Sequence, residues 1–174
     1  SSPDESDFAY IKNTGYMPVL SGETTVSGLF VDSSASLDLG GYSLNASNAF
    51  FNRGVVFTLS GDMDIQAGSI TTGTLVNEAG NIELTAGTIS LSGDLTTAGG
   101  TVTLEGDVSI LSGGSSIITS PIVSISGDFT KDADSTFSVS GGKIEFTATT
   151  AGHTITANGA SFGDVEFNGA GGGW

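Results

Sequence analysis

Residues 80–110, GNIELTAGTISLSGDLTTAGGTVTLEGDVSI, contain the pattern from which the fold can be predicted. This stretch contains the phrase GNIEL at 80–84 and a near copy, GTVTL at 100–104, each an apolar–polar–apolar triplet that follows a glycine. Alternation with a period of two residues is typical of a β-strand that buries one of its faces. Only two or three turn residues separate successive pairs of apolar residues, so the strands are too short for a meander of hairpins.

The same phrase recurs along most of the chain. Its anchors stand 21, 19, 20, 21, 21 and 21 residues apart, at Gly40, Gly61, Gly80, Gly100, Pro121, Gly142 and Gly163. A weaker copy, GETTV at 22–26, precedes them. A constant period near 20 residues with three short strands per period predicts an all-β fold, a parallel β-solenoid (β-helix) of roughly eight coils. An antiparallel sandwich also suits short strands, but it gives no reason for a constant period.

The alternation also predicts which side chains point into the solenoid. One expected inward column is Tyr42, Met63, Ile82, Val102, Val123, Ile144 and Val165. A second column is Leu44, Ile65, Leu84, Leu104, Ile125, Phe146 and Phe167. In the fourth period, further inward positions are expected at Val108, Ile110 and Ile117. The glycines between the pairs are expected at corners, where glycine relieves unusual backbone angles.

The two ends of the chain differ from the repeat. Residues 1–20 carry two tyrosines, a phenylalanine and two of the three prolines, and they are predicted to form an N-terminal cap or an arm that exchanges with a neighbouring molecule. Solenoids need such an atypical element because an open coil exposes strand edges. Residues 21–174 form the predicted solenoid, and its last coil is expected to be incomplete or to face another subunit.

Composition excludes several classes of protein. The chain has 27 Gly, 25 Ser and 21 Thr, but only 4 basic residues against 19 acidic ones, and its net charge is −15. So few cations argue against nucleic-acid binding. No apolar run is long enough to insert into a membrane. With no Cys and one His, no zinc or disulfide scaffold is expected.

No enzyme activity is expected, and no catalytic or cofactor-binding residue is assigned. A lyase acting on acidic sugars needs basic residues, whereas Lys12, Arg53, Lys131 and Lys143 are scattered over the sequence. His153 is interpreted as a corner residue. Pairs of threonines separated by one residue do not recur at the coil period, so the ordered array that ice binding requires is not predicted.

The acidic residues allow two interpretations. Asp64 should stack beside Glu83, and Glu145 beside Glu166, so each pair either points into solvent or binds a divalent cation such as calcium. No metal ligand is assigned. The aspartates that follow glycine could act as paired acids in glycoside hydrolysis, but their spacing favours turn residues. These aspartates are Asp62, Asp94, Asp107, Asp128 and Asp164.

The stretches GHTITANGASFGDVEFNGAGGGW at 152–174 and SLDLGGYSL at 36–44 resemble right-handed parallel β-helix repeats of large secreted or cell-surface bacterial proteins, such as adhesins and autotransporter passengers. The resemblance implies an exported, elongated protein with a structural or adhesive role, and it supplies no catalytic residue.

We therefore expect an extracellular or cell-surface structural protein, a segment of a fibre, stalk or surface layer that assembles end to end with copies of itself. Phe162, Phe167 and Trp174 are expected to be buried by that partner, for which the 1–20 arm is a candidate. The alternative is an adhesin or glycan-binding passenger, which exposed aromatic residues on a lateral face would favour.

Overall fold

The computed structural model describes residues 6–78 and 80–174, and these residues form strands and no helix. The strands are β1 (Phe8–Ile11), β2 (Thr24–Val31), β3 (Ser36–Asp38), β4 (Leu44–Thr58), β5 (Met63–Asn77), β6 (Ile82–Leu91), β7 (Leu95–Thr97), β8 (Val102–Ile110), β9 (Ser115–Thr119), β10 (Ile122–Ile125), β11 (Phe129–Lys131), β12 (Thr136–Ser140), β13 (Lys143–Phe146), β14 (Ile155–Thr156) and β15 (Asp164–Phe167).

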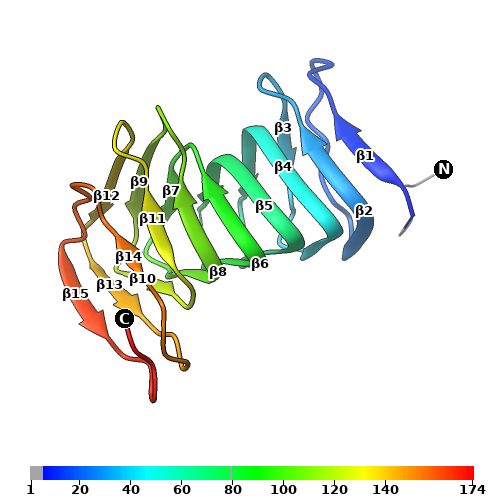
Figure 1. Cartoon of the computed structure of the whole chain (residues 1–174). Coiled ribbons are helices and arrows are strands. Elements are labelled where there is room, and N and C mark those ends of the chain that lie inside the picture. Colours follow the sequence, from blue (N-terminus) through cyan, green and yellow to red (C-terminus); the bar gives the residue numbers. More distant parts are fainter. Residues whose placement is uncertain (1–5, 79) are drawn as a thin grey trace.

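The chain winds into a parallel β-solenoid of about eight coils, as predicted (Figure 1). Strands of successive coils pair in parallel, and the paired residues lie about 20 positions apart in the sequence. The first face contains the beginnings of β2, β4, β5, β6 and β8, followed by β10, β13 and β15. β1 and β14 lie on the second face, and β3, β7, β9 and β12 lie on the third. The described ends of the chain lie at opposite ends of the stack.

The core consists of columns of apolar side chains. On the first face, the predicted columns from Met63 to Ile144 and from Leu44 to Phe146 are buried and in register. Two further columns line the other faces: Leu29, Phe50, Ile70, Ile89, Val108 and Phe129 on the second, and Leu37, Val56, Leu75, Leu95, Ile118 and Val139 on the third.

Two sequence predictions about inward positions are wrong, and so is the alignment of one early copy of the repeat. Tyr42 is exposed because it lies in the turn before β4 rather than in a strand. Ile117 points outward, and its neighbour Ile118 occupies the core, because β9 is paired so that Ile118 stands beside Leu95. The early copy GETTV is displaced by two residues, since the pairing places Thr24 rather than Val26 beside Leu44.

The corners are closed by buried polar side chains. Thr97 Oγ1 donates to the carbonyl of Gly100, and Ser120 Oγ donates to the carbonyl of Ile122. Thr58 uses its hydroxyl in the same way. These bonds satisfy carbonyl groups that turn away from the backbone ladder, so the turns between the third and first faces can be tight without leaving polar groups unpaired.

The N-terminal segment continues the coil. β1 pairs with the second half of β2, with Phe8 beside Gly28 and Ile11 beside Val31, and Val19 forms a bridge with Asp38 on the third face. Ala9 and Ile11 pack against the core. Residues 6–20 are thus in step with the 20-residue period. Residues 1–5 of the predicted cap lie outside the described residues.

Candidate functional site

The C-terminal coil ends in an open strand edge. β15 pairs with β13 along one side, and no described strand pairs with its other side. Phe146 of β13 is fully buried, whereas 59% of Phe167 and 45% of Val165 are exposed. Both exposed residues belong to columns that are buried in the coils before them. The edge therefore combines unpaired backbone groups with apolar side chains, and such an edge can pair with another strand.

The predicted aromatic trio surrounds this end, but its members differ in exposure. Trp174 and Phe162 are partly buried and pack against the core. The Trp174 ring lies 4.8 Å from that of Phe146, and the Phe162 ring lies 5.9 Å from it. Phe167 stacks on Phe146 at 5.4 Å and lies 6.2 Å from the Trp174 ring, yet it remains exposed. Phe167 is thus the member of the trio with the most surface left to bury.

The aspartates that follow glycine link successive coils. Asp62 and Asp94 each accept a hydrogen bond from a backbone N–H of the next coil, those of Asn81 and Ile117, both at 2.8 Å. Asp107 and Asp128 do the same at 2.9 Å. This geometry agrees with their interpretation as turn residues. Asp164 lies on the last coil, exposed to solvent.

Asp107, Asp128 and His153 form a cluster whose geometry could hold a metal ion. Its ligand atoms are already used within the fold. Asp128 Oδ1 accepts the backbone N–H of Thr154 and lies 3.1 Å from Nδ1 of His153. The backbone bond, followed by the contact with His153, holds the pKa of Asp128 below its ordinary value. His153 is thereby positioned at a corner, as expected.

The two predicted acidic pairs have different surroundings. Glu145 and Glu166 are neighbours in register, and Lys143 Nζ bridges them, at 2.6 Å from the Glu145 carboxylate. Asp64 and Glu83 are also in register but have no such cation. Desolvation, then the charges of Asp64 and further carboxylates, raise the pKa of Glu83. A lysine therefore already occupies the space between the C-terminal pair.

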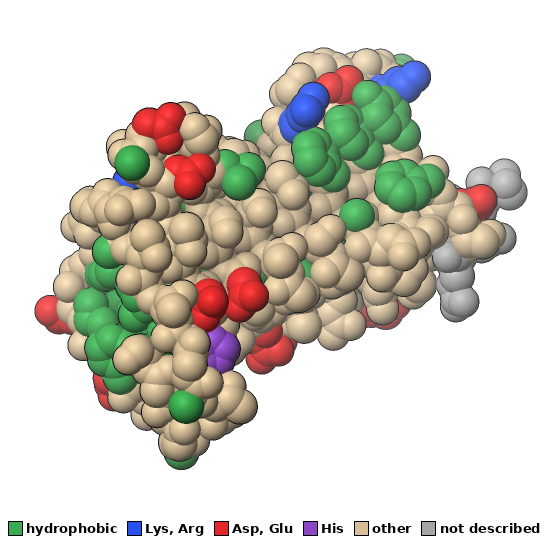
Figure 2. All heavy atoms as spheres, viewed as in Figure 1, with side chains coloured by type: hydrophobic (Ala, Val, Ile, Leu, Met, Phe, Trp, Pro, Cys, Tyr) green, Lys and Arg blue, Asp and Glu red, His purple; other side chains and the backbone are tan. Residues whose placement is uncertain are grey.

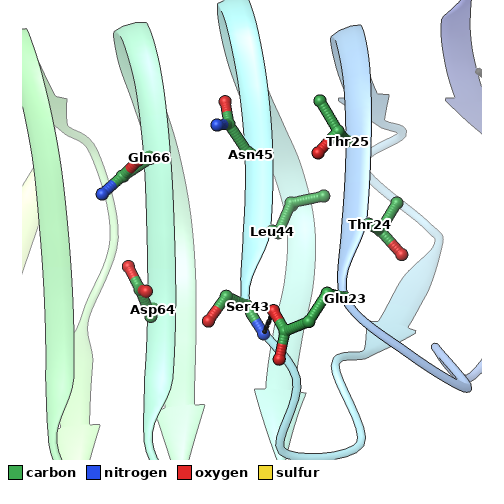
Figure 3. Close-up of a pocket in the computed structure, with 8 residues that line it drawn as sticks. All are labelled: Glu23, Thr24, Thr25, Ser43, Leu44, Asn45, Asp64 and Gln66. Carbon is green, nitrogen blue, oxygen red and sulfur yellow. Dashed lines mark hydrogen bonds between the residues drawn. The ribbon is translucent and has the colours of Figure 1, made fainter. Parts of the chain in front are cut away.

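The outer side of the first face carries a shallow polar groove. A cavity of about 230 Å³ lies between two rows of outward side chains, Glu23, Ser43 and Asp64 in one row and Thr25, Asn45 and Gln66 in the other (Figure 3). The backbone N–H of Ser43 donates to Glu23 across adjacent coils. The groove contains hydrogen-bonding groups and acids, but no described cation or nucleophile pair that would support catalysis.

A feature that the sequence interpretation missed lies on the second face. Tyr10, Phe30 and Phe51 stand beside each other in register and form an aromatic ladder, with ring centroids 4.8 and 5.2 Å apart. Next to it run Lys12, Asp32 and Arg53. The signal is present in the sequence as three aromatic residues about 20 positions apart.

The cations of this patch contact the rings. Lys12 lies over Tyr10 at 5.2 Å, and Arg53 lies 5.2 Å from the Phe51 centroid. Tyr10 donates its hydroxyl to Asp32. Figure 2 shows hydrophobic and basic side chains gathered over the N-terminal coils, on a surface that is otherwise largely neutral or acidic. Lys12 and Arg53, two of the four basic residues, thus lie on one patch although they are far apart in the sequence.

The other two cations serve the fold. Lys131 is buried, with a relative exposure of 3%. Its Nζ donates to the carbonyls of Asp132 and Asn158. Lys143 bridges the glutamates described above. The basic residues therefore divide between an internal position, the C-terminal coil and the aromatic ladder, and they do not converge on one catalytic centre.

Comparison with protein-family models, curated proteins and solved structures finds no match for this chain. The fold and the surface geometry therefore carry the functional argument. Among the described residues, no helix has the length and apolar character needed to cross a bilayer.

Proposed function

We propose that this chain is an extracellular structural protein, a rigid β-solenoid unit of a fibre, stalk or surface layer that stacks end to end with copies of itself. The observation that carries the proposal is the open edge of β15, where Val165 and Phe167 continue two core columns but remain exposed.

Stacking at this edge has two physical sources of stability. A further parallel strand would pair the free backbone groups of β15, as each coil pairs with the next throughout the solenoid. It would also cover the exposed part of Phe167, and burial of this area contributes about 1–2 kcal/mol. The columns of buried aliphatic side chains make the rod stiff, and its Ser, Thr and Asp exterior keeps it soluble.

Negative-stain electron microscopy tests this proposal. One copy has about eight coils, which span roughly 38 Å at the ~4.8 Å spacing of paired strands. At high protein concentration we expect rods of constant width whose lengths are multiples of this value. Monodisperse rods of single-copy length at the highest concentration would contradict it.

A second candidate function is glycan binding in an adhesin, and the aromatic ladder favours it. Tyr10 is 49% exposed, and the ladder adjoins a groove of about 380 Å³ lined by Lys12, Tyr16 and Met17. Exposed aromatic rings beside hydrogen-bonding and charged groups suit a ligand with an apolar face and hydroxyl groups.

A carbohydrate array tests the second candidate. The wild-type chain is compared with Phe51→Thr, because threonine occupies the next position of the same outward column at Thr71. We expect glycan signals that fall at least tenfold in the variant. Absence of binding, or equal binding by both proteins, would remove the ladder as a glycan site.

A further inference from the structure

One outward row of side chains runs along the second face of the solenoid, and we call it the axial row. It begins with the aromatic ladder and continues, with one residue from each coil, through residues that carry hydroxyl groups. In order along the rod, the axial row consists of Tyr10, Phe30, Phe51, Thr71, Ser90, Ser109, Thr130 and Thr156. Because paired strands lie about 4.8 Å apart, the row presents one side chain at each such interval.

The five hydroxyl groups of the axial row are available to a ligand. Their side chains alternate along the strands with core residues such as Ile70 and Ile89, so they point outward, and none of the five is buried. Within residues 6–78 and 80–174, no protein group forms a hydrogen bond with these hydroxyls. Each of them can donate one hydrogen bond and accept two. Figure 2 shows neutral side chains between the hydrophobic group over the N-terminal coils and the acidic group beside His153.

The aromatic half of the axial row offers apolar contacts. Neighbouring rings are nearly parallel, with interplanar angles of 14° and 9°. Their centroids lie 4.8 and 5.2 Å apart, further than the separation of about 3.5–4.0 Å at which carbon atoms touch, so the rings overlap only in part. Tyr10 is 49% exposed. The rings therefore present apolar surface in steps of one coil.

We propose that the axial row binds a linear, neutral polysaccharide of β-1,4-linked pyranose units, which lies along the rod with one sugar unit for each coil. This inference rests on the second candidate function, glycan binding at the aromatic ladder. It adds the class of glycan, its direction and the hydroxyl half of the site. A pyranose has a C–H face that packs on aromatic rings, and hydroxyl groups at its edge that pair with Ser and Thr.

The spacing of the axial row favours this linkage. A β-1,4-linked chain is extended, and each of its pyranose units is about as long as the ~4.8 Å spacing of paired strands. Successive sugars can therefore meet successive members of the row in the same way. An α-1,4-linked chain of the same sugar coils, so it leaves a straight row after a few units. The rigid sheet holds these contacts in place before the ligand arrives, which lowers the entropic cost of binding.

The charges beside the axial row favour a neutral chain. The next outward row of the second face contains Asp107 and Asp128, beside the hydroxyl half. Their carboxylates repel an acidic sugar but accept hydrogen bonds from sugar hydroxyls. Beside the aromatic half, the charge of Asp32 offsets part of the positive charge of Lys12 and Arg53. An uncharged ligand satisfies both halves of the row.

Calorimetry with cellotriose and cellohexaose tests the extent of the site. Three β-1,4-linked glucose units cover the aromatic half, whereas six units also reach Thr71, Ser90 and Ser109. The wild-type chain should bind the hexamer at least tenfold more tightly than the trimer. Ser90→Ala combined with Ser109→Ala should weaken binding of the hexamer at least fivefold, because it removes two hydroxyl contacts. The same variant should bind the trimer like the wild-type chain.

The matched control protein carries Thr103→Ala and Ser124→Ala, two outward hydroxyl residues that are neighbours in register on the first face. It should bind the hexamer like the wild-type chain. Two further hexamers serve as control ligands. Maltohexaose contains the same sugar in α-1,4 linkage, and a β-1,4-linked hexamer of mannuronic acid carries a carboxylate on every unit. Each should bind at least tenfold more weakly than cellohexaose.

The outcomes separate this inference from the second candidate function. Equal affinity for trimer and hexamer, or equal loss of hexamer binding in the test and control proteins, would overturn the axial row and leave glycan binding at the ladder standing. Equal binding of either control ligand would overturn the class of glycan. Absence of any glycan binding, on the array and in calorimetry, would overturn both proposals.

Circular dichroism checks the fold of each variant. If Ser90→Ala with Ser109→Ala loses its β-sheet signal, Thr71→Ala takes its place, since Thr71 is the first hydroxyl residue of the row. Weaker binding of the hexamer by this variant supports the inference, and unchanged binding overturns it.

Discussion

The ring of Phe167 stacks on the ring of Phe146 with centroids 5.4 Å apart, yet Phe146 is fully buried while 59% of Phe167 is exposed. The two residues occupy successive positions of one column. Their difference in exposure therefore shows how much side-chain surface one additional coil buries on the coil before it. It also separates residues that hold a single copy together from those that would join two copies.

Substitution at these two positions should affect different properties, the stability of one copy and its self-association. Phe146→Ala should lower the free energy of unfolding by about 3–5 kcal/mol, because it leaves a cavity in a packed column. Phe167→Ala should change the melting temperature of the dilute protein much less but weaken self-association at least tenfold. Thermal melts at low concentration and sedimentation at high concentration measure the two effects. If Phe167→Ala self-associates as strongly as the wild-type protein, the proposed role of the β15 edge is wrong.

Added salt should strengthen self-association. Each copy carries a net charge of −15, so neighbouring copies repel one another. Raising the ionic strength from 0.01 to 0.15 M shortens the screening length from about 30 to about 8 Å, which weakens this repulsion. Sedimentation velocity in a salt series should show larger species at higher salt. Dissociation on addition of salt would indicate a junction held by ion pairs instead.

Neutralising Glu83 should stabilise the fold at pH 7. Its folded-state pKa is raised above the ordinary value of 4.5, so the free energy of unfolding falls as the pH rises from 4.5 through the raised pKa. Glu83→Gln removes this loss. We expect a gain of up to about 0.5 kcal/mol at pH 7, because like-charge pairs on an exposed face are weak.

The gain from Glu83→Gln should disappear below about pH 4, where the wild-type carboxyl group is protonated in both states. Glu78→Gln, the same change outside this row, is the control. Urea titrations at several pH values measure the difference. A gain that is equal at pH 4 and pH 7 would show that charge repulsion is not its cause.

Replacement by alanine should destabilise the fold at the corner glycine Gly106 but not at Gly87, its neighbour in the preceding coil. Gly106 has φ of 141°, and a Cβ there would lie 1.8 Å from the carbonyl oxygen of Ala86. Gly106→Ala should therefore cost at least about 1–3 kcal/mol of stability. A Cβ at Gly87 would meet its nearest neighbour at 3.5 Å, so Gly87→Ala should be nearly neutral. Equal melting temperatures for the two variants would contradict this account.

The sequence predicted the solenoid because inward positions repeat with a fixed period. The column from Leu44 to Phe146 could be found by alignment of glycine anchors, since each strand has one buried face. The same alignment was wrong at Ile117, because alternation alone does not distinguish which of two adjacent isoleucines faces the core. Pairing with Leu95 decides it, and that information is not local.

The surface was harder to predict than the core. The ladder of Tyr10, Phe30 and Phe51 depends on outward register across three coils, and its first member lies in a segment interpreted as outside the period. The bridging position of Lys143 likewise depends on side-chain reach between Glu145 and Glu166. The arrangement of Phe162, Phe167 and Trp174 around Phe146 also depends on contacts between coils.

Small-angle X-ray scattering over a series of concentrations tests end-to-end assembly most directly, because it reports length and cross-section separately. We predict that the overall radius of gyration rises with concentration while the cross-sectional radius stays constant, and that Phe167→Ala suppresses the rise. Scattering that fits one 17.4 kDa copy at every concentration, or a cross-section that grows with the length, would contradict the account.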